Sequence, residues 1–388
     1  MSFQFPEQGP LLARCASTSV GHPLRGLDQA VTCVRCAGVL TVSSLEIVCA
    51  HCGQKYPRVG RIPVLLPRPD DHVSLWRQQL ALLVAQGEHT LSGMDAEAAL
   101  PGVVRPGQTR LRTLAKAVSD QLREISEVVS PALGGPLPPA QSVGLPRGVV
   151  EHIHFLYRDW GWDGGASLEN QQSLDAIREM VGGQGLGGTL VLGAGGCRLA
   201  YDLHRQCGAS DTVVLDIDPY LFLVAEEVIR GGSVQLTEAS PAVQQVGRTA
   251  RSWTLRAPAG PLGDDHFHFF LANGLAPPFV QGTFDTIVTP WFIDQVPTDL
   301  PAFLRTVNLM LRPGGRWINH GPLLYPPDAP LSRRFSCEEV LELAEQAGFG
   351  IERTSAVSGP HFVSPLTGRG KVEWVLTFVA AKIGEPPS

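Results

Sequence analysis

Long apolar runs are missing from this sequence. No stretch of about 18 consecutive apolar residues occurs in the chain, so we expect no membrane-spanning helix. The first residues, MSFQFPEQGP, also lack the basic and apolar regions of a secretory signal peptide. We therefore expect a cytoplasmic protein, in which cysteines stay reduced and paired Cys-x-x-Cys motifs indicate metal ligands rather than disulfides.

Charged residues make up only 18% of the 388 residues, against 44% hydrophobic residues, which is typical of a soluble globular protein. The 31 basic and 37 acidic residues give a formal charge of −6, and this mild acidity disfavours nucleic acid as a partner. The length allows one large core and at least one smaller unit. The 42 glycines and 32 prolines predict long connections.

Two Cys-x-x-Cys pairs near the N-terminus form the strongest short motif. Cys33 and Cys36 are followed, twelve residues later, by Cys49 and Cys52, a spacing that suits two knuckles joined by a β-hairpin with its turn at residues 43–44. Four thiolates are a closed tetrahedral set for Zn²⁺, so the site should be structural rather than catalytic. The alternative is four unrelated buried thiols. The remaining cysteines lack such spacing and are expected to be small apolar residues: Cys15, Cys197, Cys207 and Cys337.

Helical periodicity follows the cysteine motif. Residues 74–96 and 107–130 carry apolar side chains at three- and four-residue steps. The Pro/Gly-rich segment 130–148 then reads as a domain boundary, or alternatively as a long ordered loop. The predicted division is therefore a zinc ribbon (1–68), a helical region with its connector (69–148) and a larger domain (149–388).

Short apolar runs alternate with helical stretches after the connector, and this alternation predicts a doubly wound α/β sheet. No helix separates the last two runs, so we expect an antiparallel hairpin to close the sheet. The predicted strands are GTLVLGAGG, DTVVLDID, FDTIVTPWFI, GRWINHGPLL, FGIERTSAV and EWVLTFVAAK.

A glycine loop lies between the first of these strands and a helix. Gly193, Gly195 and Gly196 let the backbone approach a ligand closely at a helix N-terminus. About twenty residues on, Asp216 ends the next strand, where a carboxylate can accept two ribose hydroxyls. Arg198 stands where a dinucleotide motif would have its third glycine, so the loop favours S-adenosylmethionine over a dinucleotide.

Residues 150 to 382 resemble the carnosine N-methyltransferase family. The resemblance is carried by YRDWGWDG (157–164), VLGAGGCRLAYDL (191–203), VTPWFIDQV (288–296) and LRPGGRWINHGPLLY (311–325). It implies a class I methyltransferase fold with an added helical region and an insertion at residues 228–264. It also implies methyl transfer from S-adenosylmethionine to an imidazole nitrogen of a histidine-containing dipeptide.

The resemblance, the glycine-loop pattern and the polar end of the fifth strand together supply the candidate site residues. Asp294 would contact the accepting imidazole, with His320 and Tyr325 beside it at the end of the fifth strand. His320 could equally be a structural histidine. The alternative for Asp294 is a cap of the helix that follows, which the resemblance disfavours. The cofactor residues would be Arg158, Gly193, Ala194, Gly195, Arg198, Asp216, Asn273 and Gly274.

Three positions depart from the family pattern. Pro326 replaces a histidine that helps to hold the imidazole, Asn273 replaces an aspartate near the adenine, and Phe155 replaces a glutamine before the arginine. The methyltransferase prediction survives these changes, whereas carnosine as the substrate does not. We therefore expect N-methylation of an imidazole or similar ring in a histidine-containing small molecule or peptide.

The cysteine-rich ribbon is foreign to that family and resembles the small zinc-ribbon proteins that activate RNA and protein methyltransferases. Two other functions therefore stay open: an RNA-base methyltransferase guided by the ribbon, and a non-catalytic partner that binds S-adenosylmethionine. A homodimer is a further possibility.

Overall fold

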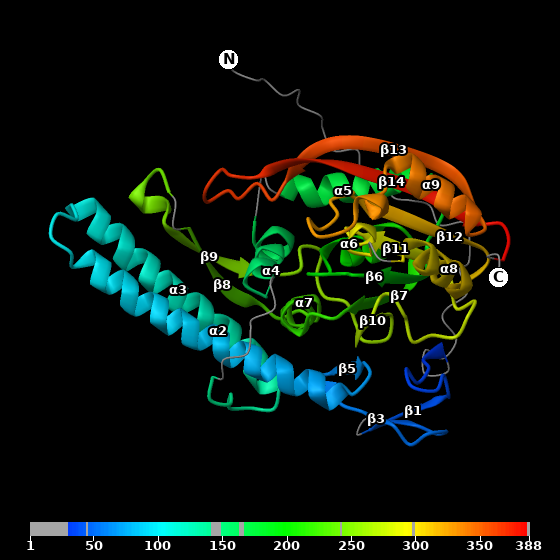
Figure 1. Ribbon diagram of the computed structural model, residues 1–388, viewed down its shortest axis with the longest axis horizontal. Helices are drawn as coiled ribbons and strands as arrows, with labels where there is room; N and C mark the ends of the chain where they lie inside the picture. Colours follow the sequence, from blue (N-terminus) through cyan, green and yellow to red (C-terminus); the bar gives the residue numbers. More distant parts are fainter. Residues whose placement is uncertain are drawn as a thin grey trace, which may run out of the picture.

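A nine-stranded sheet forms the centre of the computed structural model, which describes residues 30–43, 46–140, 149–162, 167–240, 243–296 and 299–385 (Figure 1). The strand order is β13-β14-β12-β11-β6-β7-β10-β5-β4. Strands β12, β11, β6, β7 and β10 are parallel, whereas β14 is antiparallel to both β12 and β13. From β13 to β10 this is the order of the class I methyltransferase fold, to which β5 and β4 are added at one edge, and it confirms the predicted doubly wound sheet with its terminal hairpin. The strands are β6 (Gly187–Leu192), β7 (Ala209–Asp216), β10 (Phe267–Ala272), β11 (Phe284–Pro290), β12 (Leu311–Gly321), β13 (Phe349–His361) and β14 (Lys371–Lys382).

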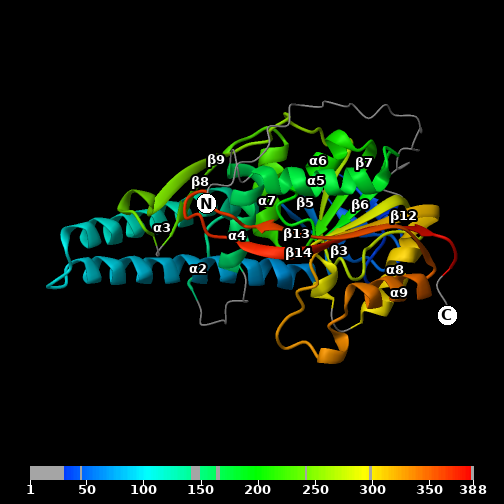
Figure 2. The same cartoon turned by 90° about the horizontal axis from the view of Figure 1, so that it is seen from above.

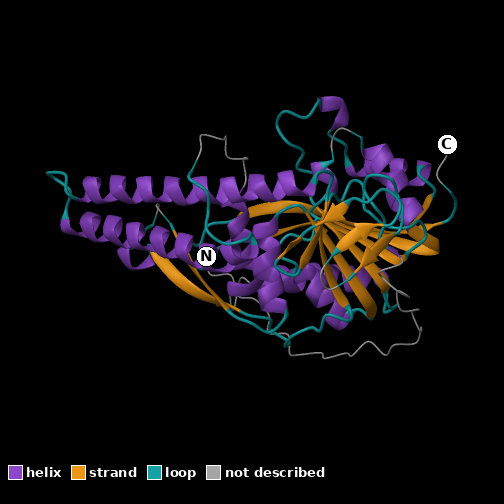
Figure 3. Ribbon diagram, turned by 90° about the horizontal axis from the view of Figure 1, so that it is seen from below, coloured by secondary structure: helices purple, strands orange, loops and turns teal. Residues whose placement is uncertain are grey.

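The two faces of the sheet pack into separate cores, because successive side chains on a strand point to opposite faces. On β6, Val191 joins the core formed with α5, α6 and α7, whereas Leu190 and Leu192 join the core formed with α8 and α9. Figures 2 and 3 show helices on both sides of the twisted sheet. The bounds are α5 (Ser167–Val181), α6 (Arg198–Gln206), α7 (Pro219–Ile229), α8 (Leu300–Met310) and α9 (Cys337–Gln346).

The cysteine-rich ribbon is joined to this sheet. Its first part is a small three-stranded sheet of β1 (Leu40–Val42), β2 (Ile47–Cys49) and β3 (Lys55–Tyr56), which contains the predicted hairpin. The chain then forms β4 (Arg58–Val59) and β5 (Ile62–Leu65), and β5 lies parallel to β10. The boundary predicted at residue 68 therefore follows two strands that belong to the central sheet, and both β5 and β10 are absent from the predicted strands.

A long helical hairpin, α2 (Pro69–Ala98) and α3 (Arg105–Ala132), projects from the sheet as an arm, and both helices contain the predicted helical stretches (Figure 1). The insertion after α7 forms a second hairpin, β8 (Val234–Ala239) and β9 (Ala250–Leu255), which packs on α3. Buried Glu124 of α3 accepts hydrogen bonds from the backbone N–H and the hydroxyl of Thr237 on β8. Among the residues described, no helix is long and apolar enough to cross a membrane.

Helix α4 (Val149–Leu156) continues into a π-helical turn, η1 (Tyr157–Gly161), which links the arm to the sheet. The Tyr157 hydroxyl accepts a hydrogen bond from Gln121 of the arm and donates one to the carbonyl of Thr237. At the other end of the turn, a Cβ on Gly161 would lie 2.8 Å from Leu255 Cδ2, so the β8–β9 hairpin is pressed against η1. Turns of this type often occur at functional sites.

Two glycines of α2 provide a test of how tightly the arm is packed. Ala is better than Gly in a helix by about 1 kcal/mol. A Cβ at Gly93 meets nothing within 4 Å, so Gly93→Ala should raise the free energy of unfolding by about that amount. A Cβ at Gly87 would lie 1.8 Å from Leu122 Cδ1 of α3, so Gly87→Ala must displace Leu122 at a cost of about 1–3 kcal/mol.

Urea denaturation of both variants measures the difference. Gly87→Ala should come out at least about 1 kcal/mol less stable than Gly93→Ala. Equal stabilisation by the two substitutions would contradict the close approach of the two helices at this point.

Candidate functional site

The glycine loop connects β6 to α6 and adopts a backbone that favours glycine. Gly193 has φ +67° and Gly195 has φ +53°. A Cβ at Gly193 would lie 2.3 Å from Cδ2 of Phe292, whereas a Cβ at Gly195 meets nothing within 4 Å. Ala194, between the two glycines, donates its backbone N–H to the carbonyl of Leu215. The loop is therefore held to the end of β7, with one glycine in contact with a ring and the other open.

Asp216 lies beside this loop at the end of β7. Its carboxylate accepts hydrogen bonds from the backbone N–H groups of Gly195 (2.8 Å), Ile217 (2.7 Å) and Asp218 (3.0 Å). Burial, followed by the nearby charge of Asp218, raises the pKa of Asp216. The structure thus brings together the predicted loop and the predicted acid.

The predicted adenine contacts follow β10. Asn273 accepts a hydrogen bond from the backbone N–H of Leu275 through Oδ1, at 2.9 Å. A Cβ at Gly274 would lie 2.9 Å from Cζ of Phe292. Phe292 therefore contacts two of the predicted cofactor glycines, Gly193 and Gly274, although the sequence analysis did not select it. Its only sequence signal is its place directly after the end of β11.

The two predicted cofactor arginines lie in different surroundings. Arg158, on η1, is almost fully buried, with Nε 2.7 Å from Asp159 and a terminal nitrogen 3.6 Å from Glu169. Arg198, at the start of α6, pairs with Asp202 at 2.7 Å and donates to the carbonyl of Asp159. Both side chains are therefore held by protein groups beside the glycine loop, whose Gly196 carbonyl accepts a hydrogen bond from Trp160 of η1.

Asp294 lies just beyond β11, in the short turn η3 (Ile293–Gln295), and is only 3% exposed. Oδ2 accepts a hydrogen bond from the backbone N–H of Leu324 at 3.1 Å, and Oδ1 lies 3.3 Å from Nε2 of Gln295. Burial raises the pKa of Asp294. The cap of α8 is a different residue, Asp299, whose carboxylate accepts the backbone N–H of Ala302. The alternative in which Asp294 caps this helix is therefore wrong.

Tyr325 carries a buried hydroxyl that has no hydrogen-bond partner among the described residues. Burial, and next the charge of Asp294, raise the pKa of Tyr325 well above its usual range. An unpaired buried hydroxyl costs about 1–3 kcal/mol, so such a group calls for a partner from outside the chain. It lies one residue after Leu324, the residue that Asp294 holds.

The polar end of β12 is largely structural. His320 is fully buried and its Nδ1 lies 2.9 Å from the Thr377 hydroxyl. Burial, with a smaller contribution from the charge of Arg158, lowers the pKa of His320 to about 4, so the ring is neutral at pH 7. Asn319 donates to the carbonyl of Leu376 and accepts from Thr289.

A stacked ring pair that the sequence analysis did not select lies next to His320. Trp291, which donates its backbone N–H to the His320 carbonyl, stacks on His361 with ring centroids 3.9 Å apart and planes at 12°. His361 Nδ1 lies 2.8 Å from Glu169, the carboxylate that also pairs with Arg158. Trp291 has φ +52°, a left-handed backbone that is strained for a bulky residue and is found mainly at functional sites.

The four predicted metal ligands come together in the ribbon. The Sγ atoms of Cys33, Cys36, Cys49 and Cys52 all lie within 4.8 Å of one another. The Tyr56 hydroxyl lies 3.0 Å from Cys33 Sγ. Cys197, Cys207 and Cys337 lie outside this cluster, and Cys15 lies outside the described residues.

Comparisons with known proteins point to one family. Residues 263–364 match the family described as carnosine N-methyltransferase. The chain is 47% identical to the carnosine N-methyltransferase of Dictyostelium discoideum over 45 residues, which are 12% of this chain and 10% of that protein. It is 38% identical to the carnosine N-methyltransferase of Rattus norvegicus over 73 residues, 18% of each chain. The chain thus aligns with less than a fifth of the length of either relative.

Solved structures show distant similarity in shape. The N-methyltransferase NodS of Bradyrhizobium japonicum WM9, in complex with S-adenosyl-L-homocysteine, is 14% identical with a TM-score of 0.38, covering 60% of this chain and 99% of that one. A methyltransferase from Aquifex aeolicus is 15% identical with a TM-score of 0.37, covering 57% and 95%. The match to the family model and to the two relatives confirms the resemblance found in the sequence, and the family model locates it at residues 263–364, the segment that contains Asn273, Asp294, His320 and Tyr325.

Proposed function

We propose that this chain is an S-adenosylmethionine-dependent N-methyltransferase that acts on an imidazole, or a similar ring nitrogen, of a histidine-containing small molecule or peptide. The observation that carries the proposal is that two groups of residues lie at the carboxyl ends of neighbouring strands. The glycine loop and Asp216 end β6 and β7, while Asp294 and Tyr325 follow the neighbouring strands β11 and β12. Ligands of open α/β sheets bind beyond the carboxyl ends of the strands.

The residues present fit S-adenosylmethionine. Asp216 is half-buried and can accept ribose hydroxyls beside the open backbone of Gly195. Phe292 offers an aromatic surface between Gly193 and Gly274 that can exclude water from the methyl group. When bound, this cofactor supplies an electrophilic methyl group, and the protein's contribution is alignment of the acceptor and exclusion of water.

Asp294 is suited to orient an acceptor ring. In a neutral imidazole one nitrogen carries a proton and the other a lone pair. A carboxylate that accepts the N–H fixes the tautomer and directs the bare nitrogen toward the methyl group. As the ring becomes a cation, the same carboxylate stabilises the new charge and can accept the proton from that N–H. The Tyr325 hydroxyl is free to donate or accept a further hydrogen bond from the acceptor.

The charges around the site suit this reaction. His320 is neutral at pH 7, so it adds no positive charge near the ring that becomes cationic. Arg158 is positive but is paired with both Asp159 and Glu169. With Pro326 in place of a second imidazole-holding residue, we propose an acceptor larger than a dipeptide, which gains contacts from the β8–β9 hairpin that packs on η1.

We also propose that the ribbon holds one structural Zn²⁺. Four thiols gathered within 4.8 Å form a complete tetrahedral set, which leaves no open position for catalysis. The Tyr56 hydroxyl next to Cys33 is placed to hydrogen-bond the thiolate and fix its orientation.

The cofactor assignment is tested by Asp216→Asn. The substitution removes the charge that strengthens hydrogen bonds to the ribose, a loss of about 1.5–3 kcal/mol, so the affinity for S-adenosylhomocysteine should fall at least tenfold in calorimetry. Asp175→Asn, an exposed site on α5, serves as the matched control and should bind normally. Unchanged affinity in Asp216→Asn would remove the ribose role from this carboxylate.

The metal assignment is tested by elemental analysis. Protein purified without chelator should contain about one zinc per chain. Cys36→Ser should lose it, whereas Cys337→Ser, a free thiol outside the cluster, should keep it. Retention of zinc by Cys36→Ser, or less than about half an equivalent in the parent protein, would count against the site.

The acceptor role of Asp294 is tested against its neighbour Asp299. Asp294→Asn should lower kcat on imidazole-containing acceptors by about 10²–10³, as expected for one electrostatic contact to a developing charge, with cofactor affinity unchanged. Asp299→Ala should leave the rate unchanged and lower the free energy of unfolding by about 1 kcal/mol, because it removes only the α8 cap.

Tyr325→Phe completes this series. Loss of one hydrogen bond to the acceptor should raise KM or lower kcat by about tenfold. Because the hydroxyl bonds no group in the described part of the chain, stability should not fall. Wild-type turnover by Asp294→Asn, or a product methylated on oxygen, carbon or sulfur, would overturn the imidazole mechanism.

A further inference from the structure

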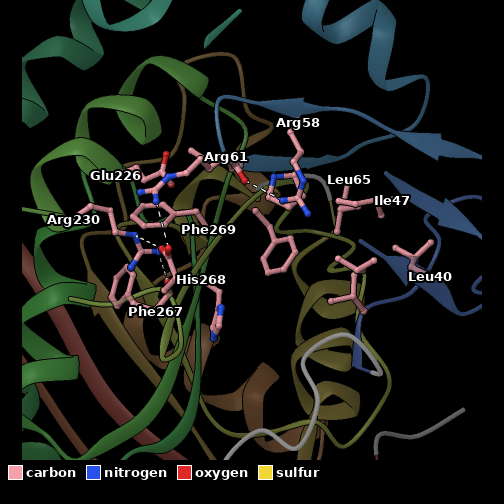
Figure 4. Close-up of a pocket in the computed structure, with 16 residues that line it drawn as sticks. Leu40, Ile47, Arg58, Arg61, Leu65, Glu226, Arg230, Phe267, His268 and Phe269 are labelled. Carbon is pink, nitrogen blue, oxygen red and sulfur yellow. Dashed lines mark hydrogen bonds and ion pairs between the residues drawn. The ribbon is translucent and has the colours of Figure 1, made fainter. Parts of the chain in front are cut away.

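A cavity of about 510 Å³ lies between the ribbon and the first half of β10, at a place that the proposed reaction does not use (Figure 4). Figure 4 shows two kinds of wall: Leu40, Ile47 and Leu65 on one side, and a cluster with Arg61, Glu226 and Arg230 on the other. Its size is within the range of small-molecule sites, about 300–1,000 Å³.

The cavity exists because β5 diverges from β10. The two strands pair at only two positions, Leu271 with Val64 and Ala272 with Leu65. The first two residues of β5 pair with β4 instead. On the side of β10 that faces away from β7, residues Phe267 to Phe270 therefore have no neighbouring strand in the described part of the chain. The cavity, called the seam below, therefore lies between the ribbon and the sheet, and aromatic side chains of β10 line its base.

The ribbon side of the seam is apolar. Leu40 and Ile47 of the β1–β2 hairpin face the cavity together with half-buried Val42. Leu65 of β5 and Phe270 of β10 continue this surface. Such a wall favours an aliphatic or aromatic body in the ligand.

The side of the cavity opposite the ribbon carries charged residues, and its positive and negative charges are paired with one another. Arg61 pairs with Glu226 at 3.2 Å and with Asp264 at 3.3 Å, and Arg230 pairs with Asp264 at 2.8 Å. Two guanidinium groups are thus matched by two carboxylates. Burial lowers the pKa of His268, which lines the same cavity, and this favours its neutral form.

Arg58 is the cation left without a counter-charge. Its guanidinium donates only to two neutral carbonyls, those of Arg61 at 3.0 Å and Ser43 at 3.3 Å, and it pairs with no carboxylate among the residues described. A guanidinium has five N–H donors, so donors remain for a carboxylate or another oxyanion. The cavity therefore combines an apolar wall with one unbalanced positive charge.

We infer that this seam is a binding site for a small organic monoanion with an apolar body, whose acidic group pairs with Arg58. The apolar part of this ligand lies along the wall formed by Leu40, Val42 and Ile47. The site lies apart from the proposed acceptor pocket, because it is lined by the first half of β10, whereas the acceptor residues follow β11 and β12.

The same elements that line the seam continue to the cofactor residues. Helix α7 has Glu226 in the cavity and is capped by Asp218, which donates its backbone N–H to the carboxylate of Asp216. Strand β10 runs from the cavity to Asn273. A ligand in the seam thus contacts the helix that follows Asp216 and the strand that precedes Asn273, although the inference concerns binding alone and stands without any methyl transfer.

Octanoate is the probe for this site. The experiment measures whether octanoate displaces the fluorescent anion 1-anilinonaphthalene-8-sulfonate from the 388-residue protein purified with its zinc. Octanoate should displace the dye from one saturable site. Octylamine, with the same tail and the opposite charge, and acetate, with the charge but no tail, should not. Displacement by octylamine as strong as that by octanoate would overturn the role of Arg58.

Substitutions locate the site. Arg58→Gln should weaken octanoate at least tenfold, the usual effect of one lost charge-assisted hydrogen bond, whereas Arg58→Lys should retain part of the affinity. Val42→Asp places a negative charge on the half-buried apolar wall and should weaken octanoate to a similar degree. Arg305→Gln, at an exposed position on α8, is the matched control and should bind as the parent does.

Two checks keep the result decisive. Zinc content and S-adenosylhomocysteine affinity of each variant report whether the ribbon and the sheet are intact. Octanoate binding of wild-type strength in both Arg58→Gln and Val42→Asp would overturn the inference, even if the chain proves to be a methyltransferase.

Discussion

The site depends on one constraint: neighbouring parallel strands place their carboxyl ends side by side at the same end of the sheet. Parallel pairing of β7, β6, β11 and β12 brings Asp216, the glycine loop, Asp294 and Tyr325 together, although they are far apart in the sequence. The contact between the loop and Asp216 depends directly on this register, because the N–H of Gly195 on the β6 side donates to a carboxylate on the β7 side. A shift of one residue in β7 would turn the Asp216 side chain to the other face.

Buried charge is the second organising feature of this edge. Arg158 lies inside the protein, where an unpaired guanidinium would be very costly, and it is accompanied by Asp159 and Glu169. Glu169 in turn holds the His361 ring and the backbone N–H of Phe362. The carboxylate of Glu169 therefore connects Arg158 of η1 to the stacked rings of Trp291 and His361. The strained backbone of Trp291 is held in place by its contacts with His361 and with the His320 carbonyl.

The sequence was sufficient for whatever depends on local pattern. The glycine loop, Asp216, the helical arm, the terminal hairpin and the four cysteines follow from spacing, periodicity and residue type. Contacts that depend on tertiary packing could not be predicted from the sequence. Phe292 and Trp291 are ordinary aromatic residues after a strand, and nothing in their spacing shows that they would lie against Gly193 or His361. His361 ends a long strand more than a hundred residues from Glu169, and only the fold brings the two side chains to 2.8 Å.

The same limit explains why the ribbon reads as a separate module in the sequence. Its cysteines and hairpin are local features, whereas the pairing of β5 with β10 joins residues about two hundred positions apart. That pairing is short, with two register positions. The ribbon is also joined to the rest of the molecule by a bridge between Val31 and Phe279 and by an apolar core that it shares with the sheet. The short strand pairing leaves the cavity open beside the first half of β10, and the composition of its walls becomes informative. Had the seam served only to bury the ribbon, each of its arginines would be expected to pair with a carboxylate. Arg61 and Arg230 do so, whereas Arg58 pairs with no carboxylate of the described segments.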